Sequence, residues 1–119
     1  MKIRTIKELL DARLIVGEDF LDNEVLYACG SDLMSDVLTF VKEQTVLLTG
    51  LNNPQVIRTA EMLDVSAIVL VRGKTPSPDI IQMALERDIV LLSTDNTLFE
   101  ACGKLYEGGL RGRPDDSKC

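Results

Sequence analysis

The feature that most constrains the fold is a pair of short segments, apolar throughout, on either side of one amphipathic stretch. The first segment is Val46-Leu47-Leu48 and the second is Ala67-Ile68-Val69-Leu70-Val71. Between them, Asn53-Pro54 opens a run with apolar residues at helical spacing that reaches about Asp64. Uninterrupted apolar strands are typical of parallel sheets covered by helices on both faces. Residues 46–76 are therefore predicted to form a strand–helix–strand unit.

The same alternation of strand and helix patterns continues on both sides of this unit. Further strands are predicted at residues 14–17, 25–29 and 89–92. Capping signals predict helices that start at Thr5, Ser31-Asp32, Ser77-Pro78 and Thr97. Apolar residues at helical spacing in the last helix are expected to face the core: Leu98, Phe99, Cys102, Leu105 and Tyr106.

These patterns predict one α/β domain over residues 1–110. Its sheet is expected to be mostly parallel, with about four or five strands flanked by helices in layers. Because the first two strands have weaker patterns, one of them is expected to be antiparallel or at the edge. Residues 111–119 are polar and are predicted to be a disordered tail.

Composition argues against several kinds of site. The 119 residues carry a net charge of −6 and contain no histidine and three cysteines, none in C-x-x-C spacing. No metal site or cofactor is therefore expected. Catalysis by a histidine-dependent nucleophile is excluded. An acidic chain repels phosphate backbones, so nucleic acid is not expected as a partner.

Location follows from the same kind of argument. No apolar run approaches the roughly 20 residues needed to cross a bilayer. The amphipathic start at Met1-Lys2-Ile3-Arg4 is unlike a secretory leader. A cytoplasmic protein that does not enter membranes is expected.

Polar residues follow each predicted parallel strand, where ligands of open α/β sheets bind. Because helix N-termini favour anions, these loops predict a site for a small anionic ligand, such as a nucleotide or a phosphorylated metabolite. The candidate residues are Thr49, Gly50, Asn52, Asn53, Arg72, Gly73, Lys74, Ser93, Thr94 and Asp95. Helix caps and turn glycines explain the same residues without a ligand. Asp32, Asp36 and Asp95 likewise suit either Mg²⁺ or capping, and capping is favoured.

Several of these loops also resemble the DRTGG domain family. The resemblance is carried by Leu48-Thr49-Gly50-Leu51-Asn52-Asn53-Pro54-Gln55, Ala67 to Gly73, Leu92-Ser93-Thr94-Asp95 and Thr97 to Ala101, with Gly30 to Val37 upstream. It implies an α/β sandwich similar to the amino-terminal domain of HPr kinase/phosphorylase. It also implies a regulatory or dimer-forming role, because related domains accompany pyrophosphatases and phosphotransacetylases.

Two functions remain open. The leading hypothesis is a non-catalytic regulatory or scaffold domain that forms a homodimer and contacts a metabolic or signalling enzyme. The helix at residues 33–41 is its candidate interface. The alternative is a sensor that binds the small anionic ligand at the loops described above. An enzyme is not expected, because no residue set matches a catalytic pattern.

Overall fold

The computed structural model describes residues 1–40 and 44–112, with the side chain of Phe40 excepted. Its elements alternate as the sequence predicts. In chain order they are α1 (Ile3–Leu9), β1 (Arg13–Val16), the 3₁₀ helix η1 (Glu18–Phe20), β2 (Tyr27–Gly30), α2 (Met34–Phe40), β3 (Thr45–Thr49), α3 (Pro54–Met62), β4 (Ala67–Leu70), α4 (Pro78–Glu86), β5 (Val90–Ser93) and α5 (Leu98–Glu107). No helix in this part of the chain is long and apolar enough to span a membrane.

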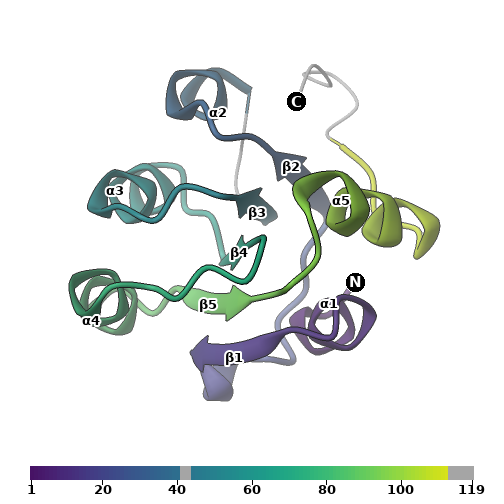
Figure 1. Cartoon of the computed structure of the whole chain (residues 1–119), viewed down its shortest axis with the longest axis horizontal. Helices are drawn as coiled ribbons and strands as arrows, with labels where there is room; N and C mark the ends of the chain where they lie inside the picture. The colour runs from purple at the N-terminus through teal and green to yellow at the C-terminus, as the bar shows by residue number, and fades with distance from the viewer. Residues whose placement is uncertain (41–43, 113–119) are drawn as a thin grey trace.

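The strands form one five-stranded sheet in the order β1-β5-β4-β3-β2 (Figure 1). The four strands β2 to β5 run parallel, and β1 pairs antiparallel with β5. The predicted mostly parallel α/β fold is therefore confirmed. The expectation for the two weaker strands also holds, since β1 is antiparallel and β1 and β2 form the two edges.

Helices cover both faces of the sheet. Figure 1 shows α2, α3 and α4 side by side on one face, and α1 and α5 on the other. Alternate residues of β3 serve the two sides: Val46 and Leu48 belong to the cluster with α1 and α5, and Leu47 belongs to the other. Every residue of β3, β4 and β5 is buried. Burial on both faces explains why these strands contain uninterrupted apolar runs, with the polar residues Thr45, Thr49 and Ser93 only at strand ends.

The predicted helix starts are partly confirmed. The hydroxyl of Ser77 accepts a hydrogen bond from Ile80 N, and the Thr97 hydroxyl accepts one from Glu100 N. The cap predicted at Thr5 is wrong, because α1 begins two residues earlier, after Lys2. Backbone carbonyls of Asn23 and Leu21 accept from the first free amides of α1, so that helix start needs no side-chain cap.

Three of the helices are followed by an aspartate with a left-handed backbone. Asp11, Asp64 and Asp88 follow α1, α3 and α4 and have positive φ angles of 49°, 56° and 56°. After α3, Val65 N donates to Ala60 O at 2.8 Å, which is the long hydrogen bond of a Schellman motif. Glycine usually occupies this left-handed position, so the sequence contains no obvious stop signal at these three points.

Several residues predicted to face the core are exposed. In α5, Ala101 and Leu105 are buried, but Phe99 is 88% exposed and Tyr106 is 59% exposed. The reason is position: α5 lies over β2 at the margin of the sheet, with α1 on its other side (Figure 1). Beyond that margin, no described helix covers the outer side of α5.

The predicted interface helix is only partly buried. In α2, Met34 and Val37 are buried, whereas Leu33, just before it, and Leu38 are exposed. Val41 of the predicted helix lies outside the described residues.

Most of the predicted tail, residues 113–119, also lies outside the described residues. At the start of this tail, Arg111 forms a bridge with Tyr27 of β2.

Candidate functional site

The loops after the parallel strands meet at one edge of the sheet, as predicted. Backbone hydrogen bonds join them directly: Arg72 N donates to Asn96 O and Gly73 N donates to Thr94 O, both at 2.8 Å. Val71 N donates to Thr49 O at 3.0 Å. The candidate residues therefore do come together, but much of their polar chemistry already holds the loops to one another.

Asp32 organises the loop after β3. One carboxylate oxygen, Oδ1, accepts from Gly50 N at 2.7 Å and from the Thr49 hydroxyl at 3.0 Å. Thr49 Oγ1 in turn accepts from Leu51 N at 3.2 Å. Sequence reasoning assigned Asp32 to capping the helix that follows it. Its carboxylate instead reaches across to the neighbouring strand, and the Ser31 hydroxyl accepts from Leu33 N.

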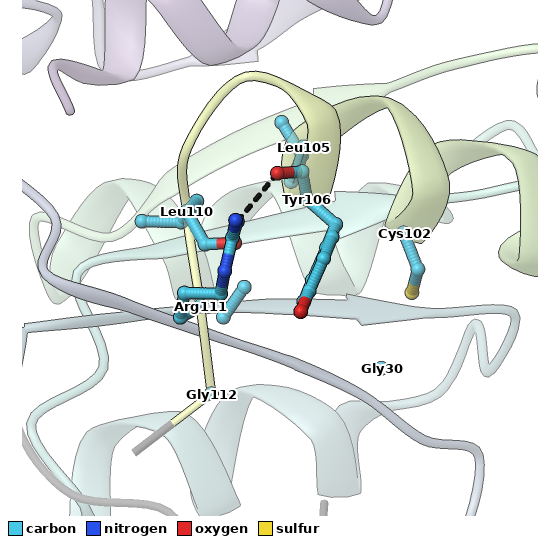
Figure 2. A pocket seen from close by; sticks show the side chains of 8 residues that line it. Gly30, Cys102, Leu105, Tyr106, Leu110, Arg111 and Gly112 are labelled. Carbon is cyan, nitrogen blue, oxygen red and sulfur yellow. Dashed lines mark hydrogen bonds between the residues drawn. The ribbon is translucent and has the colours of Figure 1, made fainter. Parts of the chain in front are cut away.

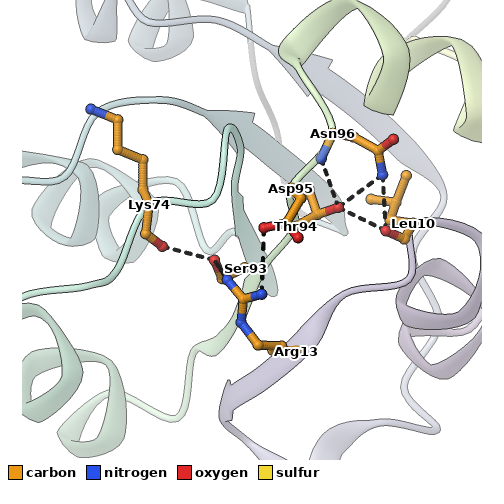
Figure 3. Close-up of polar contacts among 7 residues, drawn as sticks. All are labelled: Leu10, Arg13, Lys74, Ser93, Thr94, Asp95 and Asn96. Carbon is orange, nitrogen blue, oxygen red and sulfur yellow. Dashed lines mark hydrogen bonds and ion pairs between the residues drawn. The ribbon is translucent and has the colours of Figure 1, made fainter.

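Thr94 organises the loop after β5 (Figure 3). Its buried hydroxyl donates to Leu10 O at 2.7 Å, and the side-chain amide of Asn96 donates to the same carbonyl at 2.9 Å. These bonds satisfy the C-terminal end of α1. In the same region, the buried Ser93 hydroxyl donates to Lys74 O at 2.8 Å. Thr94 and Ser93 are therefore structural parts of the site.

Arg13 is a site residue that sequence reasoning missed. It opens β1, and antiparallel pairing places it opposite Ser93 at the carboxyl end of β5. Its guanidinium donates to Ser93 Oγ at 3.1 Å and lies 3.4 Å from the Asp95 carboxylate (Figure 3). Only the pairing of β1 with β5 could have revealed this, because Arg13 is distant in sequence from every predicted loop.

The predicted cations lie on the same rim. Arg72 is exposed, and its guanidinium packs so closely on Gly50 that a β-carbon there would collide with it. Both Arg72 and Gly73 have left-handed backbones, with φ angles of 62° and 67°. This conformation turns the chain so that both amides reach the β5 loop, which leaves side chains as the groups available to an anion.

The two asparagines behave differently from each other. Asn52 is exposed, and its side-chain amide donates to Thr75 O at 2.8 Å, which ties the β3 loop to the β4 loop. Asn53 is the N-cap residue of α3, but its side chain makes no capping bond. Its buried Oδ1 has no partner among the described residues.

A cavity of about 440 Å³ lies away from these loops, between β2 and α5 (Figure 2). Its lining is mainly apolar, and Arg111 closes one side with its guanidinium 3.7 Å from the centre of the Tyr106 ring. Cys102 also lines it, and burial raises the pKa of this thiol. Nothing in the sequence marks this cavity, because its walls come from segments far apart.

Within residues 1–40 and 44–112, no three acidic, cysteine or histidine side chains gather as a metal-binding set. Asp32 and Asp95, two of the residues weighed for Mg²⁺, instead bind the Thr49 loop and Arg13. The arrangement can therefore hold a ligand through cationic side chains and can present apolar surface.

Comparison with known proteins places this geometry in context. A crystal structure of the CBS and DRTGG domains of the regulatory region of Clostridium perfringens pyrophosphatase, complexed with the activator diadenosine tetraphosphate, is similar with a TM-score of 0.71 and 20% identity. The match covers 87% of this chain and 45% of that one, so this chain spans less than half of it. No curated protein matches. The family model for the DRTGG domain matches residues 5–107, and the chain belongs to the DRTGG domain family.

Proposed function

We propose that this chain is a non-catalytic regulatory domain that associates with itself and with a partner protein, such as a metabolic or signalling enzyme. The observation that carries the proposal is the apolar surface near edge strand β2. Eight large apolar side chains are exposed in the described part of the chain. Five of them lie on elements next to β2: Leu26 and Leu33 just before and after this strand, Leu38 on α2, and Phe99 and Tyr106 on α5, which contacts β2. Gathered exposed apolar residues are typical of interaction surfaces.

The family and the structural likeness support the same proposal. DRTGG domains are found in the regulatory region of the similar pyrophosphatase, although the low identity limits that likeness to the fold. Because function depends on the sites that a fold carries and not on the fold alone, this chain's own surface supports the proposal. On that surface, the polar groups at the loop edge mostly hold the structure together.

Light scattering tests the self-association. Size-exclusion chromatography with multi-angle detection, over a hundredfold range of protein concentration, should give the mass of two chains at the upper end. A dimer is expected because closed two-fold assemblies dominate among soluble oligomers. A mass of one chain, about 13.2 kDa, at every concentration would refute this part of the proposal.

A second candidate function is a sensor for a small anionic ligand at the loop edge. The observation that favours it is that Arg13, Arg72 and Lys74 all lie on segments at the same edge of the sheet, with Asp95 as the acidic neighbour described above. The activator bound by the similar pyrophosphatase region is itself a polyphosphate anion. Side-chain cations would supply the affinity, since the amides of Gly50, Arg72 and Gly73 already donate within the loops.

Thermal shift tests this second function. ATP, AMP and diadenosine tetraphosphate are added separately to the protein, and a ligand at a hundredfold excess over its Kd stabilises by about 2.7 kcal/mol. Arg72→Glu/Lys74→Glu should abolish the shift. Arg58→Glu/Lys2→Glu, which changes the net charge equally but lies outside the loops, should keep it. No shift with any of the nucleotides would count against the sensor.

A further inference from the structure

Helix α5 has a second stripe of residues besides the one that it buries. Ala101 and Leu105 face the sheet, whereas Phe99, Cys102, Gly103 and Tyr106 lie at helical spacing along the side of α5 nearer β2. We call these four residues the outer stripe. Cys102 is partly covered by Gly30 of β2, but the two aromatic rings at the ends of the stripe are exposed.

Gly103 in the middle of the outer stripe has no packing partner within the described part of one copy. It is exposed, its φ angle is not positive, and a β-carbon added to it would meet no atom of the described residues within 4 Å. Alanine is more favourable than glycine inside a helix. Glycine at such a position is expected where another backbone approaches closely. A helix outside this copy would make that approach.

We propose that the outer stripe is the contact between two copies of this chain, in which α5 packs antiparallel against α5 of a second copy and the helices cross between Cys102 and Gly103. This inference rests on the self-association proposed above and names its surface. Two-fold symmetry makes such a contact reciprocal: if residue i of one copy contacts residue j of the other, then residue j of the first copy contacts residue i of the second.

The spacing of the stripe satisfies that requirement. Phe99 lies three residues before Cys102, and Tyr106 lies three residues after Gly103. In an antiparallel pair centred between Cys102 and Gly103, each Phe99 therefore meets the Tyr106 ring of the other copy. Such an aromatic pair stabilises a contact beyond the effect of the area that it buries. The small residues at the centre let the two helix backbones come close.

Charge and area fit a second copy as well. Glu100, Lys104 and Glu107 fall outside the stripe by helical spacing, and Lys104 donates to Asn96 away from it. No like charges are thus brought together at the centre. A standard interface buries about 800 Å² on each partner, which is about an eighth of the 6265 Å² surface of this chain. Leu26 and Leu33, exposed just before and after β2, would extend the apolar contact beyond the stripe.

Sedimentation equilibrium on the full chain and its variants tests the surface. Phe99→Asp should raise the dimer Kd at least tenfold without unfolding the chain, because this ring is 88% exposed. Gly103→Leu should also raise the Kd at least tenfold, and in dilute, monomeric protein it should leave the melting temperature equal or higher. That opposite response separates an interface residue from a residue needed for folding. Met62→Asp, at a 73% exposed position on α3, is the matched control and should leave the Kd within about threefold.

The outcomes separate the two proposals. If the unmodified chain is monomeric throughout, self-association and its surface both fail. If it dimerises with the same Kd after Phe99→Asp or Gly103→Leu, self-association stands and the outer stripe is refuted. A Kd lowered by Gly103→Leu, or raised equally by Met62→Asp, would also refute the close helix crossing.

Discussion

The packing of α5 against β2 can be tested by substituting Gly30. A β-carbon built on Gly30 lies 2.5 Å from Cys102 Sγ and 3.2 Å from Leu98 Cδ1. Comfortable contacts between such atoms are about 3.5–4.0 Å, so the sulfur or the helix must move by about 1 Å. Overpacking of this kind costs about 1–3 kcal/mol. Alanine offsets about 0.4–1 kcal/mol of that cost, because it lowers the conformational entropy of the unfolded chain relative to glycine. The Gly30→Ala variant should therefore be destabilised by about 1–2 kcal/mol.

Cys102→Ala should rescue it. Removing the sulfur opens the space that the added methyl group needs, so the double variant should be more stable than the sum of the single changes by at least about 1 kcal/mol. Urea unfolding followed by circular dichroism, at one protein concentration for all variants, measures the four free energies of unfolding. Gly112→Ala is the control, because its added β-carbon would lie 3.9 Å from the nearest atom. Strict additivity, or no loss in Gly30→Ala, would show that α5 does not sit on β2 as described.

Three further predictions concern the elements that surround the sheet. Thr94→Val removes the hydroxyl that donates to Leu10 O and accepts from Asn96 N, and it should cost about 1–3 kcal/mol in urea unfolding; a neutral effect would contradict the role of this buried hydroxyl. Asp64→Gly relieves a left-handed aspartate after α3 and should raise stability by about 1 kcal/mol, read as a higher melting temperature, whereas a lower one would contradict it. The hydrogen bond from Arg4 lowers the pKa of Asp22, so this carboxylate stabilises the fold above its ordinary pKa and loses that effect as the pH falls through its lowered value. The stability gap to Asp22→Asn, measured by urea unfolding across the acid range, should thus shrink towards low pH, and a gap that widens would contradict the sign.

The centre of the fold was predictable because two independent signals agree there. β3, β4 and β5 are covered on both faces, and the apolar runs Val46 to Leu48, Ala67 to Leu70 and Val90 to Leu92 show that directly. Ser77-Pro78 and Thr97 mark helix starts with side chains that do form caps. Local chemistry and burial point to the same elements, and the resemblance to the DRTGG family adds the same fold.

The margins of the fold were not predictable for a different reason. Helical spacing identifies an apolar side of α5, but it does not tell which flank a neighbouring element covers, so Phe99 and Tyr106 were wrongly expected to face the core. Asp32 could cap its own helix or bind the amide of Gly50, and only the packing of β2 beside β3 decides this.

The candidate site shows the same limit. Its loops could be predicted from the positions of the strands, because the carboxyl ends of parallel strands lie at the same edge of a sheet. Arg13 could not, since its place depends on the antiparallel register with Ser93. The ligand role of the ten predicted site residues stays a prediction, with Thr49, Gly50, Ser93 and Thr94 largely occupied in holding the loops.

The strand order has a consequence for how the chain assembles during synthesis. β1 pairs with no strand except β5, and the two are separated by most of the chain. As the chain leaves the ribosome, β2, β3 and β4 can pair in succession, whereas Arg13–Val16 must wait until Val90–Ser93 has been made. Closing so long a loop is slow compared with local pairing. β1, the first of these five strands to be synthesised, is therefore expected to be the last to join the sheet.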